Sequence, residues 1–152
     1  MIPVFQTKTS SGDGDCFAAC LASILEEPLA VIPDFTPAIK NDNSWIVEAN
    51  LFIAHFGFYL LPVIWKATAC SSGFSIAIGN PKGGKEDNKH AVVYLGANLY
   101  HDPSPNGKGL EGNPETYMVF VALNPAQLKY GVIVEGSKSL FDRLSLFLKR
   151  NY

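Results

Sequence analysis

The sequence predicts a single α+β domain over residues 1–152, in which helices pack against an antiparallel sheet. Two apolar patterns with helical spacing lie at residues 16–26 and 44–56. Short runs rich in β-branched and aromatic residues follow, separated by Gly, Pro and Asn. The composition, 47% hydrophobic and 17% charged, is typical of a chain that folds around a core.

The first helix is expected over residues 16–26, where it ends before Pro28. Asp15 precedes this helix and is a residue type that favours the N-cap position. Four residues at helical spacing form the buried stripe: Cys20, Leu21, Ile24 and Leu25. Cys16 begins that stripe by the i, i+4 rule. Its thiol is therefore expected where the helix meets the sheet, within reach of a strand residue.

The remaining elements follow from apolar runs and from the residues that break them. Residues 2–6 form a short apolar stretch, and residues 7–15 form a polar loop. Residues 28–35 are a connector, and Gly57 ends the second helix at 44–56. Strands are expected at residues 58–65, 73–78, 90–95, 99–102 and 116–122, and the chain closes with a strand near 131–134 and a helix at 137–150.

The turn between the third and fourth strands decides which side chains share a face of the sheet. If residues 96–98 form a three-residue turn, Val92 pairs with Asp102. Asp102 then lies diagonally from His90 on one face, at a distance that side chains can bridge. His101 points to the opposite face. A two-residue turn would reverse this assignment.

Cys16, His90 and Asp102 are the three side-chain types that a thiol nucleophile needs. Helix N-termini favour a thiolate because their unpaired N–H groups carry partial positive charge. Cys16 is the expected nucleophile, His90 the base, and Asp102 the carboxylate that orients the imidazole. Gln6 and the backbone N–H of Cys16 are the expected oxyanion donors. Because Gln6 lies ten residues before Cys16, we expect the loop at residues 10–14 to bulge outward.

Short motifs surround these residues: Asp15-Cys16 with Ala19-Cys20-Leu21, then Pro81-Lys82-Gly83, His90-Ala91-Val92-Val93, and His101-Asp102-Pro103-Ser104-Pro105. With Gln6 upstream, they resemble the papain-like peptidases that process bacteriocin leaders after a double glycine. They resemble still more closely small uncharacterised papain-like proteins of bacteria and their phages. The likeness covers roughly residues 4–110. It implies a papain-like fold, with an N-terminal catalytic helix packed on an antiparallel β-sheet.

The expected activity is hydrolysis of a peptide, isopeptide or other amide bond by a Cys-His-Asp triad. The substrate is expected to cross the seam between the first helix and the sheet, between the loops at 80–89 and 103–110. Residues assigned to substrate binding are Asp15, Lys82, Gly83 and His101.

Two other functions remain open from the sequence. Acyl or γ-glutamyl transfer would use the same three residues, with an amine as the acceptor in place of water. A binding or inhibitory module, for example a phage-encoded protein that blocks a host factor, would use the cleft to hold a partner. The presence of the Cys, His and Asp together favours an enzyme over that module.

Charge and composition exclude several classes of partner. The formal net charge is −2, so broad electrostatic binding to nucleic acid or to an anionic membrane is not expected. The N-terminus lacks the pattern of a signal peptide, and polar residues interrupt the apolar stretch at 45–65, so no membrane span is expected. Three cysteines without framework spacing indicate a reducing compartment, and we expect a cytoplasmic protein.

A metal site is the remaining alternative for these residue types. Cys16, His90 and His101 are all ligand types that zinc accepts. The expected strand parity directs His101 away from the other two, and the sequence offers no closely spaced ligand pair. We therefore expect no metal and no cofactor.

Overall fold

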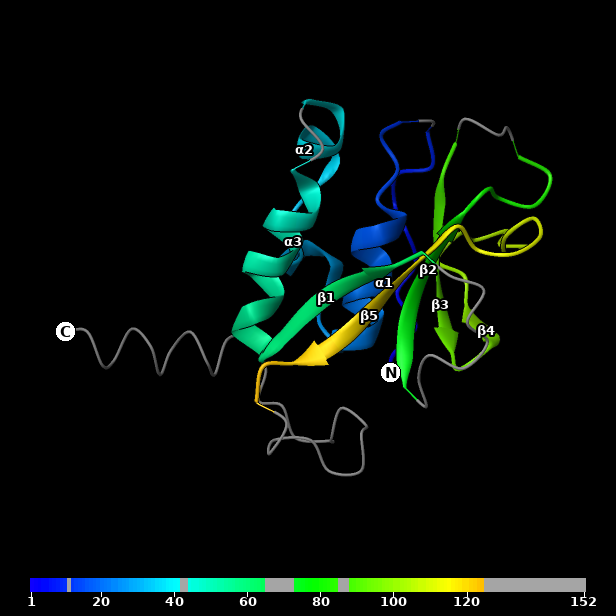
Figure 1. Cartoon of the computed structure of the whole chain (residues 1–152). Helices are drawn as coiled ribbons and strands as arrows, with labels where there is room; N and C mark the ends of the chain where they lie inside the picture. Colours follow the sequence, from blue (N-terminus) through cyan, green and yellow to red (C-terminus); the bar gives the residue numbers. More distant parts are fainter. Residues whose placement is uncertain (11, 42–43, 65–72, 85–87, 125–152) are drawn as a thin grey trace.

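The computed structural model has helices packed on an antiparallel sheet, as the sequence predicts (Figure 1). It describes residues 1–10, 12–41, 44–64, 73–84 and 88–124. The helices are α1 (Cys16–Leu25), α2 (Thr36–Asn41) and α3 (Trp45–Ile53), with 3₁₀ turns η1 (Leu29–Val31) and η2 (Ala54–Phe56). The strands are β1 (Phe58–Val63), β2 (Phe74–Gly79), β3 (His90–Leu95), β4 (Asn98–His101) and β5 (Thr116–Ala122).

The predicted helices are confirmed, with one addition. α1 begins at Cys16 as expected, and the expected second helix is α3 followed by η2, which Gly57 ends with a φ of 84°. The short α2 was not expected, because six residues carry too little periodic pattern to identify a helix. No helix in the described ranges is long and apolar enough to cross a membrane. The strand expected near 131–134 and the helix expected at 137–150 lie outside the described residues.

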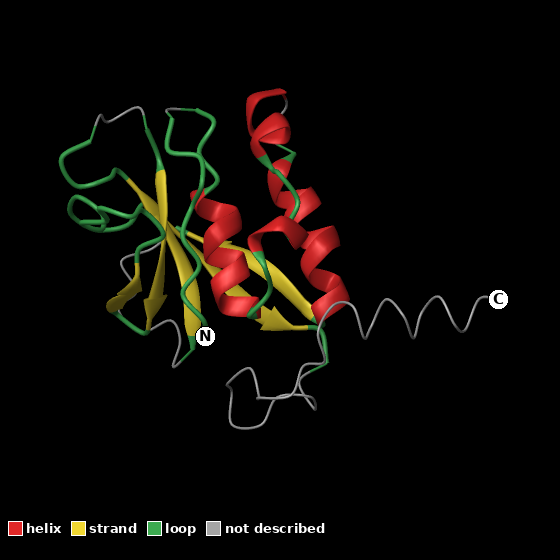
Figure 2. Cartoon of the chain, turned by 180° about the vertical axis from the view of Figure 1, so that it is seen from behind, coloured by secondary structure: helices red, strands yellow, loops and turns green. Residues whose placement is uncertain are grey.

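The sheet has the strand order β1-β5-β2-β3-β4, and every neighbouring pair is antiparallel. β5 lies between β1 and β2, so the last of the described strands joins the two halves of the sheet. Both long helices pack on one face, α1 against β2 and β3, and α3 against β1 (Figure 2). This arrangement places the start of α1 beside the start of β3.

The core lies between that sheet face and the helices. Every residue of α1 after Cys16 is buried, which gives the helix a firm position on the sheet. The side chains that fill the core from both layers include Leu21, Ile24, Ile53, Leu60, Ile76, Val93 and Met118. Cys16 packs at the margin of this cluster and is half-buried.

The N-terminal segment runs along α1 toward the start of that helix. The backbone N–H of Val4 donates to Ser23 Oγ at 2.9 Å, and Ile2 N–H donates to Ser23 O at 3.3 Å. The N–H of Gln6 donates to the carbonyl oxygen of Pro103 at 2.9 Å. The segment is thus anchored both to α1 and to the chain that leaves β4.

The turn between β3 and β4 differs from the expected one. It has two residues, since Leu95 pairs with Asn98, so the expected three-residue turn is wrong. The register then shifts within the hairpin, and Val93 pairs with His101. Tyr100 is the extra residue of this β-bulge. The bulge compensates for the shorter turn, so the side chains after it lie on the same faces of the sheet that the longer turn would have given them.

The Asn50 side chain joins α3 to β1. Its Oδ1 accepts the N–H of Leu60 at 2.6 Å, and its Nδ2 donates to Leu60 O at 3.3 Å.

Asn50→Ala is expected to lower the free energy of unfolding by about 1–3 kcal/mol, because buried Leu60 loses its backbone partner. Urea unfolding measures the change. Leu51→Ala, at a position 67% exposed, is the control, and equal losses in both variants would contradict the prediction.

Candidate active site

A cavity of about 760 Å³ opens at the start of α1. The lining includes Cys16, His90, Asp102 and Gln6, the four residues that the sequence assigns to chemistry. Cys16 is the first residue of α1, so its side chain stands at the end of the helix that faces this space. Three segments that are distant in the sequence therefore meet at one cleft.

His90 and Asp102 form a buried pair. His90 Nε2 lies 2.8 Å from Asp102 Oδ1, and the two side chains are only 10% and 8% exposed. Asp102 also accepts two backbone N–H groups, from Ser104 to Oδ1 and from Gly109 to Oδ2, both at 2.8 Å. The carboxylate is thus held from three sides and cannot turn away from the ring without losing these bonds.

The β-bulge explains how these two side chains meet. His90 is the first residue of β3, and Asp102 follows the last residue of β4. A two-residue turn without a bulge would shift the pairing by one residue and send the carboxylate to the other face. The extra residue in β4 returns Asp102 to the side on which it contacts His90.

The surroundings of His90 stabilise its charged form. Burial lowers the pKa of His90, but hydrogen bonds to Asp102 and to Cys16 outweigh burial and raise the pKa to about 9. Burial also raises the pKa of Asp102, but hydrogen bonds from His90, Ser104 and Gly109 bring it below the usual value. Because Asp102 occupies Nε2, Nδ1 is the ring nitrogen that remains for the Cys16 thiol.

Asp15 occupies the N-cap position but does not cap the helix with its side chain, contrary to expectation. Its carboxylate instead accepts the N–H of Thr7 at 3.0 Å, the Thr7 hydroxyl at 2.7 Å and the N–H of Lys8 at 2.9 Å. The N–H of Asp15 donates to Lys8 O at 3.3 Å. These bonds close the base of the intervening loop. They also leave the first N–H groups of α1 uncapped by this carboxylate.

Gln6 lines the same cavity as Cys16. Its Nε2 donates one N–H to Lys8 O at 3.3 Å, which leaves the second N–H of the amide for a ligand. Its Oε1 is buried and has no hydrogen-bond partner among the described residues. Together with the backbone N–H of Cys16, Gln6 supplies the donor types that an oxyanion requires.

The four residues assigned to substrate binding are not all in the cavity wall. Lys82 lines the cavity. Gly83 lies in the adjacent turn, where its φ is 74°, and it is not part of the lining. Asp15 holds the N-terminal segment and is also outside the lining.

His101 is outside the lining as well, because it faces the N-terminal segment. Its Nε2 lies 2.9 Å from Val4 O, and its ring packs edge-on against Phe5 at 5.3 Å. It therefore helps to position the segment that carries Gln6.

The sequence interpretation missed Gly107 and Trp45. Gly107 lies against Asp102, and a Cβ atom there would be 2.5 Å from Asp102 Oδ2 and 2.6 Å from its Cβ. The Asn106-Gly107 pair signals a turn, but only the folded chain reveals the contact. Trp45 lines the cavity from the first turn of α3, where an aromatic residue in a helical stripe suggests only packing.

Comparison with known proteins gives no match to a family model, a curated protein or a solved structure. In the described ranges, no three His, Cys, Asp or Glu side chains are grouped as metal ligands.

The charge of His90 can be followed directly by titration. In the folded protein the ring is expected to titrate near pH 9, and Asp102→Asn is expected to lower that midpoint because the partner carboxylate is lost. NMR titration of the imidazole C–H signals measures it. Asp13→Asn removes an exposed carboxylate elsewhere and should leave the midpoint unchanged. A wild-type midpoint near 6.5 would contradict the assignment.

The same pair should make the stability of the fold depend on pH. The folded-state pKa of His90 lies above its value in the unfolded chain, so the folded protein binds this proton more tightly. The stabilising contribution is complete below pH about 6.5 and is lost as the pH rises through about 9. The free energy of unfolding should therefore fall more steeply across this window in wild type than in His90→Gln. Parallel curves would refute this expectation.

Gly107→Ala tests the space beside Asp102. Gly107 does not have a left-handed φ, so the methyl group acts by contact and not by backbone strain. It should displace the Asp102 carboxylate, lower the titration midpoint of His90 and slow the reaction of Cys16 with iodoacetamide several-fold at neutral pH. Gly14→Ala is the control, since the nearest atom to its new Cβ is 3.5 Å away. An unchanged midpoint in Gly107→Ala would rule out this role.

Proposed function

We propose that the chain is a papain-like thiol hydrolase that cleaves a peptide, isopeptide or other amide bond. The observation that carries the proposal is the position of His90, whose Nε2 lies 2.8 Å from Asp102 Oδ1 and whose pKa is raised by both Asp102 and the nearby Cys16 thiol. This is the relation between base, orienting carboxylate and nucleophile that acyl chemistry requires. All three side chains line one open cavity.

In the first half of the proposed reaction, His90 Nδ1 holds the proton of the thiol, and the Cys16 thiolate attacks the carbonyl carbon. A C–S bond forms while the carbonyl π electrons move to oxygen. The backbone N–H of Cys16 and the free N–H of Gln6 Nε2 are the donors for that oxyanion. His90 then gives its proton to the leaving nitrogen as the C–N bond breaks, and a thioester remains on Cys16.

In the second half, water replaces the amine. His90 Nδ1 takes a proton from the water, whose oxygen attacks the thioester carbon. The C–S bond breaks, the acid leaves, and the thiolate and the charged imidazole are restored. Asp102 stabilises the ring whenever it is charged and holds it through Nε2, which leaves Nδ1 for the proton transfers.

The proposed partner is a peptide or protein substrate, which a host protein would supply if the chain is phage-encoded. A cytoplasmic location belongs to the same proposal, because a catalytic thiol has to stay reduced. Cys20 lies one turn further along α1 and is fully buried, and burial raises the pKa of its thiol well above the usual value. Cys16 is therefore the thiol of α1 to which the catalytic role is assigned.

Alkylation at each thiol tests the proposal. At pH 6.5, Cys16 is expected to react with iodoacetamide about tenfold faster than free glutathione, because the proposed base, His90, takes the proton of the attacking thiol, whereas few free thiols are ionised at this pH. Peptide mass spectrometry measures the rate at Cys16, with buried Cys20 as the internal control. His90→Ala should remove most of the advantage. A Cys16 rate equal to that of glutathione, or one unaffected by His90→Ala, would exclude the proposed nucleophile.

A further inference from the structure

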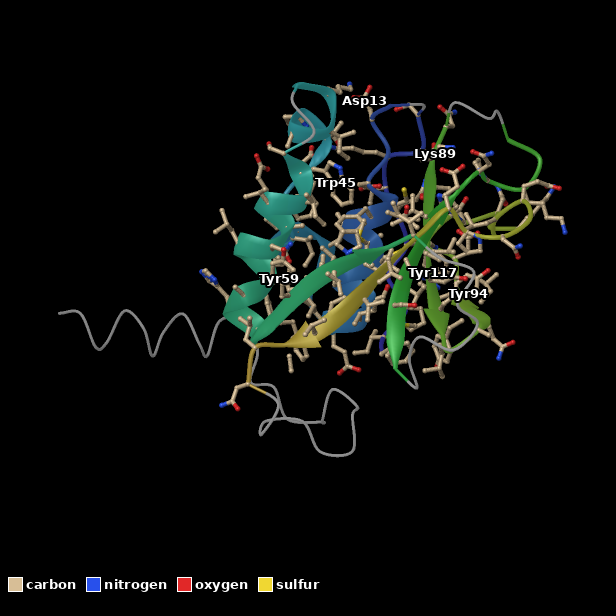
Figure 3. All side chains as sticks on the ribbon, in the orientation of Figure 1. Asp13, Trp45, Tyr59, Lys89, Tyr94 and Tyr117 are labelled. Carbon is tan, nitrogen blue, oxygen red and sulfur yellow. The ribbon has the colours of Figure 1, made fainter. Side chains whose placement is uncertain are left out.

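The cavity around Cys16 has an aromatic side. Phe17 follows Cys16 in α1 and packs edge-on against Trp45 at 5.0 Å. Trp45 is half-buried, and Ile39 of α2 beside it is 45% exposed, so both offer apolar surface to a ligand. In Figure 3, Trp45 projects from the α3 side of the molecule toward the start of α1.

The opposite side of the cavity is cationic. Lys82, Lys89 and Lys108 line the cavity, and Figure 3 places Lys89 across the start of α1 from Trp45. Two of these lysines adjoin the base and its partner in the sequence. Lys89 directly precedes His90, and Lys108 lies in the loop that follows Asp102. The N–H of Lys82 donates to Gly109 O at 3.0 Å, which joins the two lysine-bearing loops.

Among the described lining residues, the charges on this wall are not balanced within the cavity. Asp102 is the only carboxylate among the described lining residues, and its oxygens already accept bonds from His90, Ser104 and Gly109. Lys89 Nζ forms an ion pair with Glu115 at 2.6 Å. Within the described ranges, neither Lys82 nor Lys108 is in an ion pair. The chain as a whole has a net charge of −2, so this cationic wall is a local property of the cleft.

The proposed proton transfer fixes the direction in which a substrate lies between the aromatic side and the cationic side of the cavity. The leaving nitrogen has to reach His90, because that ring supplies its proton. The leaving portion of the substrate therefore lies on the side of the lysines, and the acyl portion lies on the side of Phe17 and Trp45.

We propose that the substrate carries a carboxylate in its leaving portion, bound by Lys82 and Lys108, and an apolar side chain in its acyl portion, bound against Trp45. This inference rests on the proposed function, since it needs Cys16 and His90 to define the two portions. The carboxylate can belong to an Asp or Glu side chain or to the free end of a peptide. Both present the same charge to the two ammonium groups.

The experiment uses the full chain and a library of acetylated peptides of random sequence, prepared once with free C-termini and once with amidated C-termini. Mass spectrometry identifies the products that wild type forms and Cys16→Ala does not. We expect an aromatic or aliphatic residue before the cleaved bond and a carboxylate after it. Preference for Asp or Glu in both libraries identifies a side chain, whereas preference for cleavage near the end of free-acid peptides alone identifies the terminal carboxylate.

Charge variants then assign the preference to the two lysines. The kcat/KM ratio between a cleaved peptide and its neutral counterpart, with Asn for Asp or an amide for the terminal acid, should fall about tenfold in Lys82→Gln/Lys108→Gln. It should also fall as salt is added to wild type. Lys40→Gln removes the same charge on α2, outside the lining, and should leave the ratio unchanged.

Each result separates the two proposals. Cys16-dependent cleavage without a carboxylate preference, or a preference that survives in the double variant, would overturn the assignment of the lysines and leave the hydrolase intact. The absence of any Cys16-dependent product would overturn the hydrolase and this inference together. A carboxylate preference that the double variant loses would establish Lys82 and Lys108 as specificity-determining residues.

Discussion

The geometry of the cleft depends on one shielded ion pair, between His90 and Asp102. Water reaches little of either side chain, so the attraction between the two charges is screened less than at the surface. An isolated charge in such a place would be costly, and each group is tolerated because the other is present. The backbone N–H groups of Ser104 and Gly109 satisfy the remaining carboxylate positions. The ring is thereby kept charged and oriented at the same time.

Three local features bring that pair together and place it beside the start of α1. The bulge at Tyr100 sets the face on which Asp102 emerges, and the absence of a side chain at Gly107 leaves room for its carboxylate. The packing of α1 on β2 and β3 then brings the start of the helix to the imidazole. None of these features is chemically reactive. Each one nevertheless decides whether the thiol, the imidazole and the carboxylate meet at one cavity.

The sequence predicted those parts of the molecule that are determined by residues close together in the chain. The apolar spacing after Cys16 identified α1 and its first residue, and the alternating runs identified the five described strands. It failed where a distant partner decides the outcome. Asp15 is a natural capping residue, yet the N–H groups of Thr7 and Lys8 compete successfully for its carboxylate. His101 was placed at the substrate, whereas its ring is bound to Val4 O, 97 residues away in the sequence.

The bonds that Asp15 makes to Thr7 and Lys8 have a further consequence for how such a cleft can evolve. They hold together the two ends of the intervening loop. The distance in space between Gln6 and Cys16 is therefore set by these hydrogen bonds and not by the number of residues in the loop. Insertions or deletions in the loop between Lys8 and Asp15 would reshape one border of the cleft, while the reacting groups would keep their positions. New specificities are therefore most accessible to natural variation in this short polar segment.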